Sequence, residues 1–135
     1  MSVSRVDIPV TVRGKGSLTI GLYKHLAPVT VQAVLDELPL SSRAMVYPGA
    51  MVTMLTKLKI GVEKQRLECS KGDVAFLAAN GSICIFLTNA QSQRPLNPIG
   101  KVEEGLELLQ KISAGDVIEF SRPIPPATPA PTATS

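Results

Sequence analysis

The sequence predicts a mainly β domain, a barrel or sandwich of short antiparallel strands with two short helices. Two observations predict this class. Apolar and polar residues alternate in several stretches of the chain, as they do in strands with one buried face. Turn signals separate these stretches at close spacing. A chain of 135 residues is long enough for one domain whose core needs no metal or disulfide.

The first two predicted strands form a hairpin. Val6 to Val12 alternates apolar with polar residues, a turn with two glycines follows at 13–16, and the alternation resumes over 18–22. Pro9 lacks a backbone N–H, so we expect the first strand to have a free edge there.

A helix is predicted after Ala27-Pro28, because apolar residues then recur at helical spacing up to Leu38. Proline suits the first helical turn, where its missing N–H costs nothing. Val29 to Val31 are poor helix formers, so packing onto the strands must hold this helix.

The middle of the chain predicts further strands. Short apolar runs between Met45 and Leu58 are divided by a Pro48-Gly49 turn, and another strand is expected within 60–69, preceded by an irregularity at Gly61. Apolar strands at 74–77 and 83–87 follow.

Asn80-Gly81 is a strong signal for a hairpin between these two strands. The polar stretch 88–97 is expected to be a loop. A short strand at 99–102, a second amphipathic helix over 103–112 and a last strand at 117–120 complete the domain.

Residues 1–120 are thus predicted to form the domain and residues 121–135 a tail. Five of the fifteen tail residues are proline and most others are Ala, Thr or Ser, a composition that cannot form a core. We expect a disordered or polyproline II segment. An alternative is that the tail is itself a ligand for a proline-binding groove.

The chain contains no motif typical of a metal or cofactor site. Cys69 and Cys84 lack the spacing of zinc ligands, and His25 is the only histidine. We therefore expect no metal and no cofactor, and two reduced, partly buried thiols. A bridge between Cys69 and Cys84 is the alternative.

The net charge of +3 is unevenly distributed. Residues 1–66 hold nine basic and four acidic side chains, whereas residues 67–135 hold five and seven. The basic half could face an anionic partner, but the basic residues are not clustered with aromatic ones as in nucleic-acid modules. A solvated surface is the preferred interpretation.

The location expected from the sequence is the cytoplasm. No apolar stretch approaches the roughly 18 to 20 residues that span a bilayer. The N-terminus carries Arg5 and Asp7 where a signal peptide would be apolar. No membrane partner is expected.

Four stretches together resemble the cyclophilins. Residues 21–31 are similar to the strand that leads into an "APxTV" helix, residues 80–86 to "NGSQFFI", and residues 100–107 to "GKVxEGM". With 72–76 and the short length, the chain resembles the minimal cyclophilin-like family of archaea and bacteria over residues 6–120. This resemblance implies a closed eight-stranded antiparallel barrel capped by two short α-helices.

The sequence departs from the cyclophilin isomerases at their catalytic positions. Arg43 lies five residues before Pro48, where isomerases have an arginine three residues before the proline. Thr53 and Ile83 stand where isomerases have glutamines, Leu96 falls near their histidine, and the chain has no tryptophan. Arg43 is the one candidate catalytic residue, and a surface arginine is the preferred interpretation.

Three functions remain open from the sequence. The preferred one is a binding module for a proline-containing peptide or protein segment, with weak or no prolyl isomerase activity. The others are a genuine isomerase that uses Arg43 and an accessory subunit of a larger assembly such as a ribonucleoprotein. The resemblance places the following residues in the peptide groove: Met51, Met54, Ile83, Ile85 and Leu96.

Overall fold

The computed structural model describes residues 5–47, 49–63 and 66–123. Its elements are β1 (Arg5–Val12), β2 (Gly16–Tyr23), α1 (Pro28–Glu37), β3 (Leu40–Tyr47), β4 (Met51–Leu55), β5 (Arg66–Cys69), β6 (Asp73–Leu77), β7 (Ser82–Phe86), β8 (Ala90–Glu104), the 3₁₀ helix η1 (Leu106–Lys111) and β9 (Val117–Phe120).

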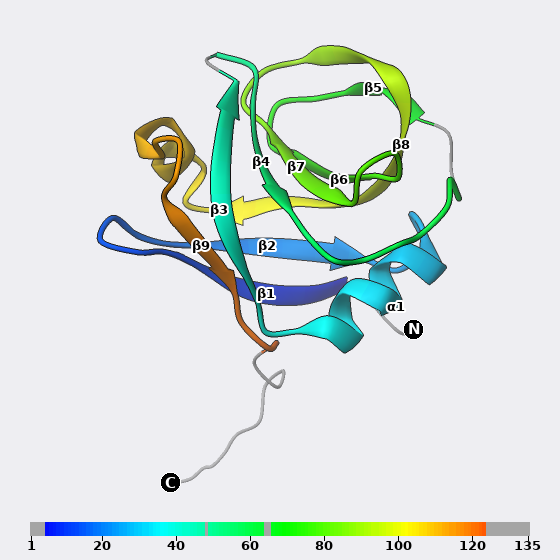
Figure 1. Ribbon diagram of the computed structural model, residues 1–135, viewed down its shortest axis with the longest axis horizontal. Helices are drawn as coiled ribbons and strands as arrows, with labels where there is room; N and C mark the ends of the chain where they lie inside the picture. The colour runs from blue at the N-terminus through cyan, green and yellow to red at the C-terminus, as the bar shows by residue number, and fades with distance from the viewer. Residues whose placement is uncertain (1–4, 48, 64–65, 124–135) are drawn as a thin grey trace, which may run out of the picture.

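Eight of these strands close into an antiparallel barrel (Figure 1). Their order is β2-β1-β9-β3-β4-β7-β6-β8, and β8 pairs back onto β2 to complete the ring. β5 pairs with β8 at the end of this order. The predicted closed eight-stranded barrel is therefore confirmed.

Two glycines allow the barrel to close between β2 and β8. Leu22 is paired with Gly100, and Gly21 lies beside it with its carbonyl against the Gly100 backbone. A Cβ atom on Gly100 would collide with the Gly21 carbonyl oxygen. The seam therefore requires a glycine at position 100.

The predicted helix that begins at Pro28 is confirmed as α1, with Val31 and Val34 fully buried. No side chain of its own caps its N-terminus. Instead the carboxylate of Glu63 accepts hydrogen bonds from the backbone N–H groups of Val29 and Thr30, each at 2.9 Å. Such a carboxylate satisfies N–H groups that a helix start leaves open.

The second helix exists, but it is a 3₁₀ helix, η1, rather than the expected α-helix over 103–112. Glu103 and Glu104 belong to the end of β8, and Gly105 turns the chain with a φ of +87°. The apolar residues Leu106, Leu109 and Ile112 recur every three residues, which is the period of a 3₁₀ helix.

Three strands differ from the sequence prediction. The polar stretch 88–97 is not a loop, since β8 already begins at Ala90 and pairs first with β5 and then with β6. β3 begins at Leu40, ahead of the expected Met45. β5 covers only the last part of the expected strand within 60–69.

The barrel core contains apolar side chains from the barrel strands and α1. Valine, isoleucine and leucine predominate in it, and Phe76 and Phe120 are its aromatic residues. This largely aliphatic core agrees with the composition, since the chain has three phenylalanines, two tyrosines and no tryptophan.

The chain after β9 continues along the barrel as far as the structure describes it. The Ser121 N–H donates to the carbonyl of Pro9, and Arg122 Nε donates to the carbonyl of Leu38 at 3.4 Å. Most of the predicted tail, residues 124–135, lies outside the described residues. Among the described residues, no helix is long and apolar enough to span a membrane.

Candidate peptide-binding face

The two faces of β7 contact different apolar clusters. Ile83 and Ile85 point into the barrel core, whereas Cys84 and Phe86 belong to a second cluster. Because successive side chains of a strand point to opposite faces, this second cluster lies on the outside of the barrel. We call it the outer cluster, and its buried members are Cys69, Ala75, Cys84, Phe86 and Leu96.

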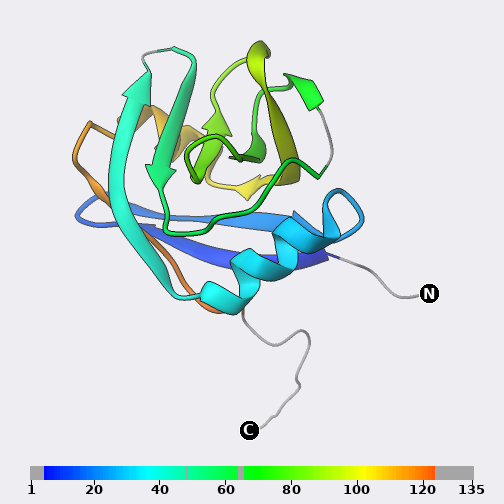
Figure 2. The same cartoon turned by 45° about the vertical axis from the view of Figure 1, so that its right-hand side comes forward.

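A ribbon made of β5 and the first part of β8 covers the outer cluster. β8 curves away from the barrel, and its first residues run beside β5 above β6 and β7 (Figures 1 and 2). Phe86 is therefore only 4% exposed although it points away from the barrel interior. The aromatic ring of Phe86 is therefore not accessible to a ligand on the outer surface.

Both cysteines are thiols buried in the outer cluster, and the alternative bridge between them is not formed. Burial, with a smaller contribution from the nearby Cys69, raises the pKa of Cys84 to about 12. A thiol with such a pKa is almost entirely protonated at neutral pH and is a poor nucleophile.

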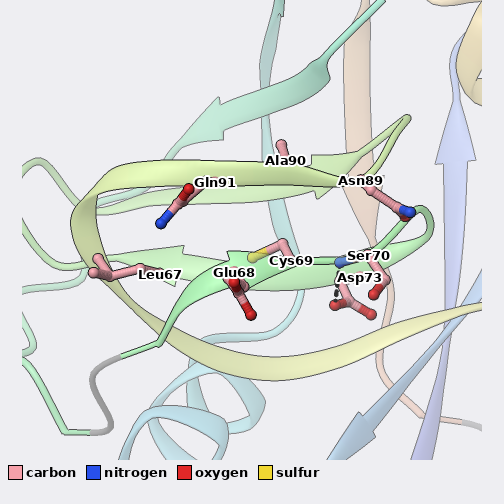
Figure 3. A pocket seen from close by; sticks show the side chains of 8 residues that line it. All are labelled: Leu67, Glu68, Cys69, Ser70, Asp73, Asn89, Ala90 and Gln91. Atoms are coloured by element: carbon pink, nitrogen blue, oxygen red, sulfur yellow. Dashed lines mark hydrogen bonds between the residues drawn. The ribbon is translucent and has the colours of Figure 1, made fainter.

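A cavity of about 970 Å³ lies against the β5–β8 ribbon (Figure 3). Its polar groups hold the turn between β5 and β6. The Asp73 carboxylate accepts the Ser70 N–H at 2.8 Å, and the Asn89 side-chain oxygen accepts the Lys71 N–H at 2.9 Å. No group of three or more His, Cys, Asp or Glu side chains that could hold a metal ion occurs among the described residues.

The five predicted groove residues do not lie together on a surface. Met54, Ile83 and Ile85 are at most 2% exposed and belong to the barrel core. Leu96 is buried in the outer cluster, and Met51 packs half-buried at its border. A ligand on the outer surface can therefore reach Met51, whereas Met54, Ile83, Ile85 and Leu96 present no surface to it.

Three exposed apolar side chains of the outer surface lie on the paired strands β3 and β4. Met45 is 57% exposed, Tyr47 46% and Leu55 55%. Tyr47 is directly opposite Met51 in the β3–β4 ladder, and Met45 is opposite Thr53. Arg43, Met45, Tyr47, Met51 and Leu55 alternate with inward-pointing residues on these two strands, and we call them the β3–β4 face.

Arg43 contributes the cation of this face. Its side chain is exposed, and Nη1 donates to the Gly115 carbonyl at 3.4 Å. Thr53, at the position where isomerases have a glutamine, is 6% exposed. The β3–β4 face thus combines apolar contact area with one guanidinium group.

Sequence reasoning missed Met45, Tyr47 and Leu55 as exposed residues. The signal was present for β3, because Arg43, Met45 and Tyr47 alternate with the apolar Ala44 and Val46. On β4 and β7 no such signal existed, since apolar residues occupy both faces of these strands.

Comparison with known proteins identifies the family. A family model described as cyclophilin-like matches residues 6–121. The chain belongs to the cyclophilin-like family. Among solved structures, a hypothetical protein from Archaeoglobus fulgidus matches with a TM-score of 0.74 and 22% identity, over 90% of this chain and 97% of the other. At this identity the likeness shows a shared fold. Comparison with curated proteins gave no match.

Proposed function

We propose that this cyclophilin-like protein is a binding module that holds a proline-containing peptide segment on the β3–β4 face, with weak or no isomerase activity. The observation that carries the proposal is the grouping of Met45, Tyr47 and Leu55, each about half exposed, on two paired strands. Exposed apolar groups gathered in one place mark interaction surfaces.

The chemistry of the face suits a proline-containing segment. The ring of Tyr47 and the side chains of Met45 and Met51 offer apolar surface for a pyrrolidine ring, and tyrosine also carries a polar group at its tip. The Arg43 guanidinium can donate to a peptide carbonyl. Residues 48–51 are similar in sequence to a Pro-Gly-Phe-Met turn of the isomerases, and Met51 is the first residue of β4.

The proposal predicts that the double variant Met45→Ser and Tyr47→Ser binds a proline-containing peptide at least tenfold more weakly. Each substitution removes apolar contact area with the peptide, and burying one such apolar side chain contributes about 1.5 to 3 kcal/mol to the free energy. The measurement is a titration of the full chain followed by amide resonances, with the wild type expected to shift along β3 and β4.

Val29→Ser is the matched control, because Val29 is 64% exposed on α1, away from this face. It should bind like the wild type. Equal affinities for the wild type and the double variant, or shifts confined to other strands, would contradict the proposal.

A further inference from the structure

A groove lined by basic side chains lies along the loop between β4 and β5 and the turn between β6 and β7. Two adjoining cavities of about 540 and 410 Å³ form it, and both are lined by Gly61, Ala78 and Ala79. Loop residues 56–62 and turn residues 78–81 line it, and Arg94 and Pro95 also line the smaller cavity. We call it the lysine groove.

The charge of the lysine groove has one sign. Lys57 and Lys59 line one cavity and Arg94 the other, and among the described residues no carboxylate lines either. Within the part of the chain that the structure describes, neither Lys57 nor Lys59 makes an ion pair. The carboxylate of Glu63, close in sequence, accepts hydrogen bonds at the start of α1 instead.

The walls are held in place at both ends of the loop. Gly81 accepts two hydrogen bonds from Thr56, one from its hydroxyl at 2.7 Å and one from its N–H at 2.8 Å. At the other end the buried Asn97 donates to the Gly61 carbonyl at 3.0 Å and accepts the Glu63 N–H at 2.7 Å. A ligand would therefore meet a groove that is already shaped, which lowers the entropic cost of binding.

We infer that the lysine groove binds an acidic segment of a partner protein, as a site distinct from the β3–β4 face. Carboxylates on an extended segment match Lys57 and Lys59. Small apolar side chains between them match Val62, which is 48% exposed, and the adjoining Ala79. A nucleic acid fits less well, because no aromatic side chain of the described residues lines either cavity to stack on a base.

The test measures binding of a fluorescein-labelled peptide in which Asp alternates with Ala and Val. A second peptide, with Asn in place of Asp, reports the part of the affinity that does not depend on charge. At low salt we expect the full-length double variant Lys57→Glu and Lys59→Glu to bind the Asp peptide at least tenfold more weakly than the wild type. Raising the salt should reduce this difference, and the Asn peptide should not distinguish the proteins.

The control is the double variant Lys24→Glu and Lys111→Glu, which makes the same change in net charge on two exposed lysines that line neither cavity. It should keep most of the wild-type affinity, and an equal loss would overturn the inference in favour of general charge attraction. Tighter binding of a single-stranded oligonucleotide that depends on Lys57 and Lys59 would overturn it in favour of a nucleic acid. Self-association abolished by the same substitutions would make the occupant a second copy of the chain.

The lysine groove and the β3–β4 face can be tested independently of each other. Lys57→Glu with Lys59→Glu should leave binding of an uncharged proline-containing peptide unchanged. Met45→Ser with Tyr47→Ser should leave binding of the Asp peptide unchanged. If either pair of substitutions lowers the affinity for both peptides equally, the two sites are not distinct and the inference is wrong.

Discussion

Lys15 shows how one side chain in a hairpin turn can join distant parts of the barrel. It lies between Gly14 and Gly16, and its Nζ pairs with the Asp116 carboxylate at 2.7 Å. The same Nζ donates to the Lys111 carbonyl and the Ser113 hydroxyl. The turn between β1 and β2 is thereby tied to the segment between η1 and β9.

This contact predicts a pH-dependent contribution to stability. The hydrogen bond from Lys15 is the main cause that lowers the pKa of Asp116 below its ordinary value of 3.8. A carboxylate with a lowered folded-state pKa stabilises the fold above its unfolded pKa, and the contribution is lost as the pH falls through the folded value. Asp116→Asn should therefore lower the free energy of unfolding at pH 7.

Denaturant unfolding at a series of pH values checks this prediction. The difference between the wild type and Asp116→Asn should stay constant above about pH 5 and shrink as the pH falls below the ordinary carboxyl pKa. Glu104→Gln, which removes an exposed carboxylate at the end of β8, is the control. A difference that is independent of pH down to the acid transition would show that Asp116 acts through packing rather than charge.

At the scale of elements, the sequence predicts a strand or helix correctly where one face of the element is buried and the other is exposed. The alternation in β1 and β2 and the helical spacing in α1 reflect one buried and one exposed face, so both were predicted correctly. β7 is apolar on both faces because the β5–β8 ribbon covers its outer side. Its inward and outward residues therefore could not be distinguished.

The placement of Ile83 and Ile85 in the candidate site follows from that ambiguity. The resemblance at residues 80–86 placed Ile83 and Ile85 in a groove, whereas Cys84 and Phe86 are the residues that point outward. A shift of one residue exchanges the two faces of a strand. The first part of β8 was missed for a related reason, since it is polar and depends on pairing with β5, which no local pattern reports.

The seam between β2 and β8 gives a prediction at the same scale. Gly100→Ala should destabilise the protein by about 1 to 3 kcal/mol or more, because the added Cβ atom meets the Gly21 backbone rather than a movable side chain. Gly61→Ala is the control, since nothing lies within 4 Å of the Cβ position and its φ is not positive. It should change stability by less than about 1 kcal/mol. Equal unfolding free energies for the two variants would contradict the close approach at the seam.

At the scale of the whole molecule, the outer surface of the barrel is divided into a covered and an open part. The ribbon of β5 and β8 buries Phe86 with its neighbours, and the open part is the β3–β4 face. Catalysis of prolyl isomerisation must lower a barrier of about 18 to 20 kcal/mol set by amide resonance. It therefore requires donors that interact more strongly with the twisted amide than with the planar one.

Binding needs less than catalysis, because an apolar face with a few donors can hold a planar peptide. On the β3–β4 face Arg43 is the charged donor, and its guanidinium also donates to the Gly115 carbonyl. Thr53 is too buried to replace the glutamine of an isomerase. The face therefore offers apolar surface to a ligand but few donors whose hydrogen bonds would become stronger in the transition state.

The protein should consequently accelerate cis/trans exchange of a proline-containing tetrapeptide weakly or not at all. The uncatalysed reaction takes tens to hundreds of seconds at 25 °C, so even modest catalysis would be visible. Arg43→Ala should match the wild type in this assay, as should Arg13→Ala, an exposed arginine at the end of β1. A wild-type rate near that of complete cyclophilins, lost in Arg43→Ala but kept in Arg13→Ala, would make the protein an isomerase and refute the binding-module proposal.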